Sequence, residues 1–151
     1  MAESQYKHLA HLAAFESEPM VFFTVVTAGR RPLLACPEAH DVLRGVWERS
    51  APRNGWWVGD YLLMPDHVHA LLAVAPERRL DRTVRAWKSY VTQQFGAEWQ
   101  SGFFDHRIRA GASLDEKAAY IRLNPVRAGL VATPEAWPWV WMPPDAPAVP
   151  W

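Results

Sequence analysis

The chain of 151 residues is long enough for one ordinary domain and too short for two independent cores. Half of its residues are hydrophobic and 21% are charged, which argues against disorder and predicts a packed globular fold. The apolar runs Val21–Val26 and Ala70–Ala75 are too short to span a bilayer, and no secretory signal is visible at the N-terminus. The single cysteine, Cys36, excludes a disulfide framework and a multi-cysteine zinc site. We therefore expect a cytoplasmic protein with no membrane partner.

The net charge is zero, but the charges are unevenly distributed along the chain. Residues 1–77 carry six Lys and Arg against nine Asp and Glu, whereas residues 78–131 carry ten against five. Local fields, rather than total charge, steer phosphate groups, so the second segment is a candidate nucleic-acid surface. A solvated helix face accounts for the same pattern, and charge alone leaves both interpretations open.

The first half of the chain predicts a strand, a helix and a β-hairpin. Val21–Thr27 is rich in β-branched and aromatic residues, which favour strands. A helix is expected to begin near Pro37, since proline suits a first helical turn, and to end before Pro52. The expected hairpin consists of strands Trp56–Met64 and His67–Val74, joined at the turn signal Pro65-Asp66.

A helix and a short strand are predicted next. Leu80–Phe95 carries apolar residues at three- and four-residue spacing and is followed by Gly96, a residue that commonly ends helices. Phe103–Ile108 is a candidate fourth strand.

A capping box, Ser113 to Glu116, predicts the start of a last helix. We expect this helix to end near Asn124, because Pro125 disfavours helical geometry at the residue before it. Six of the eighteen residues from Pro134 onward are proline, so this tail is expected to be extended or irregular. Its alternating tryptophans are expected to dock on the domain surface: Trp137, Trp139 and Trp141. The order of elements predicts an α+β fold with one antiparallel sheet and helices packed against it.

Two histidines occupy alternate positions in His67-Val68-His69. On a strand, residues i and i+2 point to the same face, so the two imidazoles are placed to converge on one divalent cation. Such a cation would need further ligands from protein oxygens or water. Taken alone, the pattern is more often found in histidines that have ordinary hydrogen-bond partners.

A second pair, Tyr120 and Asn124, lies four residues apart on one face of the predicted last helix. A phenol beside a cation and a polarised phosphate is a candidate for covalent catalysis, and an amide oxygen is a candidate ligand for magnesium or manganese. A half-buried tyrosine with an asparagine at the helix end is the alternative interpretation.

Two segments resemble motifs of a known family. Met64–Leu72 resembles the histidine–hydrophobe–histidine motif of single-tyrosine HUH nucleases. Tyr120–Val131 resembles the tyrosine motif of one branch of these enzymes, the REP-associated tyrosine transposases. Supporting similarities lie in collinear order at Phe23–Leu33 and Gly102–Arg109. The resemblance runs from about Val21 to Trp139, which is most of the chain.

The resemblance implies a ferredoxin-like antiparallel sheet with helices packed on it, in which the two histidines face the helix of the tyrosine. It implies that His67, His69 and Asn124 bind a divalent metal ion. It also implies that Tyr120 cleaves single-stranded DNA beside a hairpin, with a 5′-phosphotyrosine intermediate and a free 3′ hydroxyl. Two imidazoles and an amide oxygen leave positions open for water and phosphate oxygens, so we expect Mg²⁺ or Mn²⁺. The expected organisation is an extension (1–20), a transposase domain (21–131) and a Pro/Trp-rich tail (132–151).

Cations on the predicted helix Leu80–Phe95 and its approach, and others that flank the predicted site, are candidates for DNA contacts. Phosphate contacts need positive charge but confer no sequence choice. Tyr90 is a candidate for stacking on unpaired bases, whereas Trp87 fits the apolar face of its helix. His106 fits either a DNA contact or a hydrogen-bonded strand end, and Asp66 fits the hairpin turn better than a metal site. The predicted DNA-binding residues are Arg78, Arg79, Arg82, Arg85, Lys88, Arg107, Arg109, Arg122 and Arg127.

Two other functions fit the sequence. A non-catalytic module of the same fold would bind hairpin DNA without cutting it. A zinc-dependent hydrolase would use His67, His69 and a further ligand with an activated water, and would not need Tyr120. The combination of both histidines with Tyr120 and Asn124 favours the transposase-like enzyme, acting as a monomer or homodimer.

Overall fold

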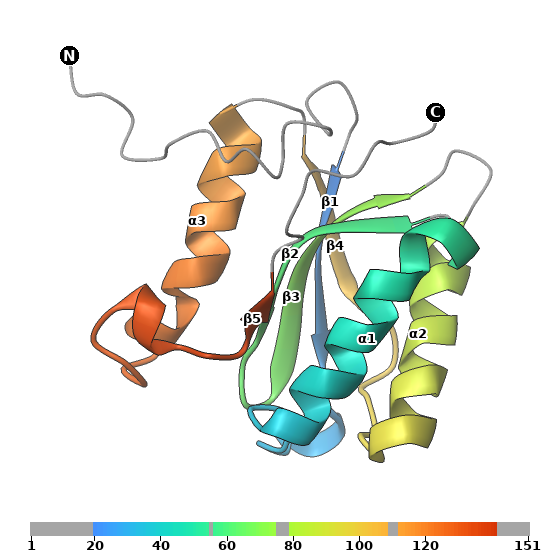
Figure 1. The fold of residues 1–151 in the computed structure, drawn as a ribbon, viewed down its shortest axis with the longest axis horizontal. Helices are drawn as coiled ribbons and strands as arrows, with labels where there is room; N and C mark the ends of the chain where they lie inside the picture. The colour runs from blue at the N-terminus through green and yellow to red at the C-terminus, as the bar shows by residue number, and fades with distance from the viewer. Residues whose placement is uncertain (1–19, 55, 75–78, 109–111, 142–151) are drawn as a thin grey trace.

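The computed structural model describes residues 20–54, 56–74, 79–108 and 112–141 (Figure 1). The strands are β1 (Met20–Val26), β2 (Trp56–Leu63), β3 (His67–Val74), β4 (Phe104–Ile108) and β5 (Val140–Trp141). The α-helices are α1 (Pro37–Asn54), α2 (Leu80–Phe95) and α3 (Ala112–Arg127), and short 3₁₀ turns lie at Ala28–Arg30 and Pro134–Ala136. The predicted extension 1–20 lies outside the described residues, except for Met20 in β1.

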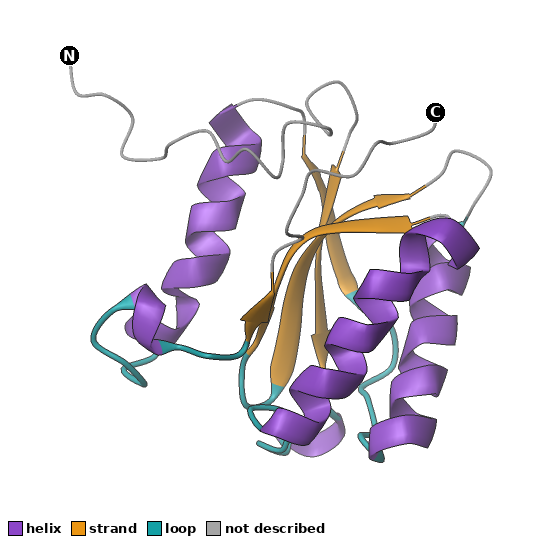
Figure 2. Ribbon diagram, viewed as in Figure 1, coloured by secondary structure: helices purple, strands orange, loops and turns teal. Residues whose placement is uncertain are grey.

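The strands, orange in Figure 2, form one antiparallel sheet. Their order in the sheet is β4-β1-β3-β2-β5. The helix α1 connects β1 to β2, and α2 connects β3 to β4, so the first four strands have the predicted ferredoxin-like arrangement. The helices α1 and α2 cover one face of the sheet and α3 covers the other (Figure 1). None of the helices in the described ranges is long and apolar enough to cross a membrane.

Alternation along the strands divides the buried side chains into two layers. On β1, Val21, Phe23 and Val25 face α1 and α2, whereas Phe22 packs on the side of α3. The layer under α3, which we call the α3 core, contains Leu62, Met64, Leu71, Ala73, Ile108, Ala118, Ile121 and Trp137. The two histidines of β3 share the parity of Leu71 and therefore lie on the α3 side of the sheet.

Both predicted proline stops are wrong. The helix α1 continues past Pro52 to Asn54, and α3 continues past Pro125 to Arg127. A proline removes one backbone hydrogen bond, but the ladder resumes directly in α3, where the amide of Ala128 donates to the carbonyl of Asn124 at 2.9 Å. The chain turns away only at Gly129, whose φ of 75° is a left-handed conformation that glycine adopts without strain.

The start of α3 also differs from the prediction. The helix begins at Ala112, one residue before the predicted cap Ser113, whose side chain lies outside what the structure describes. The strand boundaries move less: β2 ends at Leu63 and β4 begins at Phe104, one residue from the predicted ends.

The tail is more ordered than predicted as far as Trp141. Val140–Trp141 forms β5, which pairs with Tyr61 and Leu62 at the edge of β2. The indole N–H of Trp137 donates to the carbonyl of Leu63 at 2.9 Å, and the amide of Leu63 donates to the carbonyl of Trp139 at 2.8 Å. Trp137 belongs to the α3 core and Trp139 packs against it, as predicted, so this segment is anchored beneath α3. The side chain of Trp141 lies outside what the structure describes.

Candidate active site

The two histidines of β3 are each held through Nδ1. The ring of His67 donates from Nδ1 to the carboxylate of Asp66 at 2.7 Å, and Asp66 also pairs with Arg30 at 3.2 Å. The Nδ1 atom of His69 shares a hydrogen bond of 2.7 Å with the hydroxyl of Thr24 on β1. The ring centroids of the two histidines lie 4.6 Å apart. With Nδ1 engaged in each ring, Nε2 is the nitrogen left for a further ligand.

Burial, reinforced by neighbouring His67, lowers the pKa of His69 to about 3. Its imidazole is therefore neutral at physiological pH and keeps a lone pair for coordination. Burial alone would raise the pKa of Asp66, but hydrogen bonds and charge from His67 and Arg30 lower it on balance. Asp66 is thus a carboxylate that accepts from His67, the kind of outer partner that orients a metal-binding histidine.

Phe22 of β1 lies between the histidines and the helix of the candidate nucleophile. Its ring stacks on His69 with centroids 5.2 Å apart and meets the ring of Tyr120 edge-on at 6.2 Å. Tyr120 itself is 42% exposed, so its hydroxyl is open to a substrate. The structure therefore brings the predicted tyrosine and the predicted histidine pair to one surface, where Phe22 contacts both Tyr120 and His69.

Two cations surround the ring of Tyr120. The guanidinium carbon of Arg127 lies 4.4 Å from the ring centroid, and Nζ of Lys117 lies 5.5 Å from it. The spacing i, i+3, i+7 and i+10 places four residues on one face of α3: Lys117, Tyr120, Asn124 and Arg127. Sequence analysis missed Lys117, although its position three residues before Tyr120 is a signal that could have identified it. Phe22 was likewise assigned only to a strand.

Asn124 is the candidate third ligand. Its side-chain nitrogen is fully buried and has no hydrogen-bond partner within the described part of the chain. A buried amide without a protein partner is unfavourable unless another group satisfies it. The described residues contain no group of three His, Cys, Asp or Glu arranged to hold a metal ion. A cation at the histidine pair would therefore need an amide oxygen, such as that of Asn124, or water.

Arg122, predicted to contact DNA, forms an ion pair with a residue of the sheet. Its guanidinium lies 3.3 Å from the carboxylate of Asp60, which is only 2% exposed. The strand β2 changes register between Val58 and Asp60, and this irregularity brings Asp60 opposite Leu71 of the α3 core. The ion pair thus connects α3 to the sheet two residues after Tyr120.

Most of the other predicted DNA-binding residues lie away from this surface. Arg79, Arg82, Arg85 and Lys88 belong to α2 or its first flanking residue, across the sheet from the histidines. Arg79 pairs with Asp81 at 2.8 Å, and Lys88 donates to backbone carbonyls before β4. On β4, Arg107 is in register with Val21 and so points toward the α2 side, whereas His106 lies opposite Phe22 on the side of α3. Arg78 and Arg109 lie outside the described residues.

The chain belongs to the IS200-like transposase family, whose model matches residues 18–122. It is 29% identical over 126 residues to a REP-associated tyrosine transposase of Escherichia coli K12, covering 78% of this chain and 72% of that protein. It is 24% identical over 143 residues to a putative REP-associated tyrosine transposase of Haemophilus influenzae, covering 83% and 80%. These matches confirm the resemblance indicated by the sequence motifs.

Two solved structures share the fold. A REP-associated tyrosine transposase bound to a REP hairpin superimposes with a TM-score of 0.69 at 21% identity, over 93% of this chain and 82% of that one. A putative transposase from Deinococcus radiodurans superimposes with a TM-score of 0.50 at 17% identity, over 80% and 95%. The α+β architecture predicted from the sequence is therefore found in both of these solved structures.

Proposed function

We propose that this chain is a metal-dependent nuclease and strand transferase that acts on single-stranded DNA beside hairpin repeats in the cytoplasm, with Tyr120 as its nucleophile. The observation that supports this most directly is the placement of an exposed tyrosine, with two cations at its ring, on the same surface as two oriented histidines. The solved relative bound to a REP hairpin supports hairpin DNA as the substrate class.

The residues present suit Mg²⁺ or Mn²⁺. His67 and His69 would contribute Nε2, and the amide of Asn124, one helical turn after Tyr120 on α3, would contribute its oxygen. This set leaves coordination positions for water and phosphate oxygens. A bound cation would neutralise charge on the phosphate as it develops and help to align it.

The remaining chemistry belongs to the side chains around Tyr120. Its hydroxyl oxygen attacks the phosphorus, a new tyrosine–phosphate bond forms, and the bond from phosphorus to the 3′ oxygen breaks. The phenolic proton is released and the departing 3′ oxygen gains a proton, giving a free 3′ hydroxyl and a 5′-phosphotyrosine. Lys117 and Arg127, whose cationic groups lie 5.5 and 4.4 Å from the centroid of the ring, would stabilise the negative charge of the phosphate. The reverse attack, by a 3′ hydroxyl on the phosphotyrosine, rejoins a strand.

The zinc hydrolase is less well supported, because the described residues offer no third His, Cys, Asp or Glu to complete such a site. A non-catalytic hairpin-binding module would not need Nε2 of both rings to be left available.

Nicking of a labelled REP-type hairpin with single-stranded flanks tests the proposal. The wild-type protein should nick it with Mg²⁺ or Mn²⁺, and chelation should abolish nicking. The double variant His67→Ala with His69→Ala should not nick the hairpin either. The control is His106, an exposed histidine on β4, and His106→Ala should still nick the hairpin. Cleavage that is undiminished in chelator or in the double variant would contradict the metal site. Hairpin binding without any nick would favour the non-catalytic module.

A further inference from the structure

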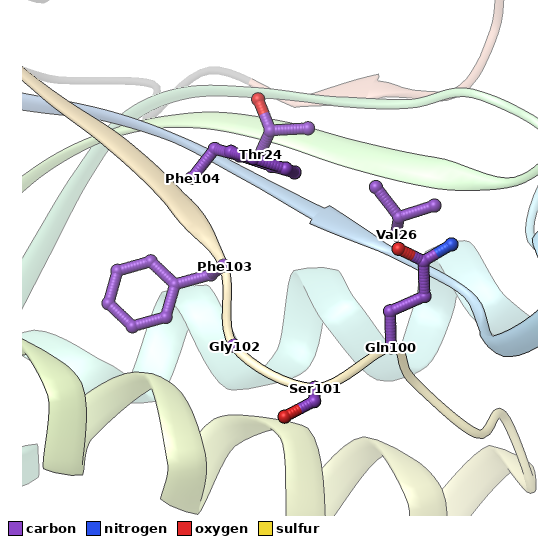
Figure 3. A pocket seen from close by; sticks show the side chains of 7 residues that line it. All are labelled: Thr24, Val26, Gln100, Ser101, Gly102, Phe103 and Phe104. Atoms are coloured by element: carbon purple, nitrogen blue, oxygen red, sulfur yellow. The ribbon is translucent and has the colours of Figure 1, made fainter.

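We propose that the pocket between β1 and the segment entering β4 binds one unpaired nucleobase of the DNA strand whose phosphate lies at His67 and His69. The pocket is open, has a volume of about 180 Å³, and is lined by Thr24 and Val26 of β1 together with Gln100 and Phe104 (Figure 3). This inference rests on the proposed function, because it requires DNA at the histidine pair.

The pocket adjoins the candidate active site through Thr24. Thr24 lines the pocket, and its hydroxyl is hydrogen-bonded to the ring of His69. In the sheet, Phe104 is in register with Thr24, and Thr24 with His69, so the three side chains form a row on the α3 side. Adjacent strands lie about 4.8 Å apart, which places the backbone of Phe104 about 10 Å from that of His69. The pocket is therefore within reach of a nucleotide one or two positions from a phosphate held at the histidines.

The side chains of the pocket match the flat face and the polar edge of a nucleobase. Phe104 is 70% exposed, the most exposed of the four large hydrophobic side chains found on the surface of the described residues. An exposed aromatic ring beside a phosphate site is a platform on which unpaired bases stack. The exposed amide of Gln100 offers a donor and an acceptor to the edge of a base. The volume is below the ~300 Å³ of pockets that take drug-sized ligands, so it suits a single ring system.

Hydrogen bonds from α2 and β1 fix the backbone of the segment that lines the pocket. The side chain of Lys88 on α2 donates to the carbonyls of Gln100 at 2.8 Å and Gly102 at 2.5 Å. The amide of Gln100 donates to the carbonyl of Val26 at 2.8 Å. Gly102, at a φ of 74°, turns the chain so that Phe103 packs toward α1 and α2 while Phe104 stays on the opposite face. Lys88 is therefore a positioning residue of this pocket, although its sequence suggested a phosphate contact.

A binding cycle between protein and DNA variants tests the pocket without requiring cleavage. The probe is a REP-type hairpin whose flanking nucleotides are replaced one at a time by an abasic site, and the protein background is Tyr120→Phe. At one flank position the abasic site should weaken binding by about tenfold, the loss expected for one stacked base. In Phe104→Ala the same abasic site should have little further effect, whereas Phe104→Trp should restore the tenfold difference. Gln100→Ala should change base preference at that position alone.

Tyr90→Ala, which removes an exposed aromatic ring from α2, is the matched control and should leave every position unchanged. If abasic sites weaken Phe104→Ala and the parent protein equally at all positions, the pocket does not bind a base. A protein that binds no hairpin at all contradicts the proposed function itself. Hairpin binding without this coupling contradicts only the pocket.

Discussion

Replacement of Trp137 tests whether the tail as far as β5 is a structural part of the domain. Trp137 is 9% exposed and packs with Ala118 and Ile121 of α3 in the α3 core. Trp137→Ala removes most of this contact and should cost about 3–5 kcal/mol of unfolding free energy. Trp137→Phe keeps a ring but removes the N–H that bonds the buried carbonyl of Leu63, and should cost about 1–3 kcal/mol.

Urea unfolding measures both losses. The alanine variant should lower the unfolding midpoint by about 2 M with an unchanged slope, because the slope follows the surface exposed on unfolding. Hydrogen exchange should accelerate in α3 more than in α1, since Trp137 contacts α3 across the α3 core. Leu130→Ala, at a side chain 46% exposed, is the control and should change stability by less than about 0.5 kcal/mol. A Trp137→Ala protein as stable as this control would refute the structural role of the tail.

The remaining predictions concern charge and pH. Lys117→Ala and Arg127→Ala should each flatten the salt dependence of DNA binding by about one unit of log–log slope. Arg82→Ala with Arg85→Ala tests the opposite face of the sheet, and a flatter slope only in that pair would place the DNA on α2. Burial and Arg44 lower the pKa of His40, so the unfolded chain binds the proton more readily. The stability that neutral His40 contributes should therefore be lost as pH falls below its ordinary value of 6.5, and His40→Gln should reduce that loss in urea unfolding between pH 7.5 and 5.5. An identical loss in the variant would assign the pH dependence to other groups.

Local patterns predicted the sheet and the long helix because each is determined mainly by its own residues. The turn signal Pro65-Asp66 marked the start of the predicted strand His67–Val74, which matches β3, and the His-x-His spacing placed both histidines on one face. The spacing of Val84, Trp87 and Val91 gave α2 its buried side, and all three are in the core. Tyr120 and Asn124 share a face of α3 for the same reason. These parts of the fold and of the candidate site were therefore available from the sequence.

Contacts between distant segments were not predictable in this way. Phe22 meets His69 and Tyr120 only after β1, β3 and α3 are packed together. The pair of Asp60 with Arg122 depends on the register change in β2 and on the placement of α3. The two-residue strand β5 is too short to give a periodic signal, and it forms because the edge of β2 is open to pairing. Packing also outweighed the local preference of proline in both α1 and α3.

Mapping the covalent protein–DNA adduct tests the central claim most directly. The wild-type protein is incubated with metal and a hairpin substrate, denatured and digested, and the peptide that carries the 5′-linked nucleotide is sequenced by mass spectrometry. The adduct should lie on Tyr120, and Tyr120→Phe should bind the hairpin while forming neither adduct nor nick. Tyr90→Phe, the matched loss of an exposed hydroxyl, should form both. An adduct on Tyr61 or Tyr90, or nicking that persists in Tyr120→Phe, would contradict the assignment of Tyr120 as the nucleophile.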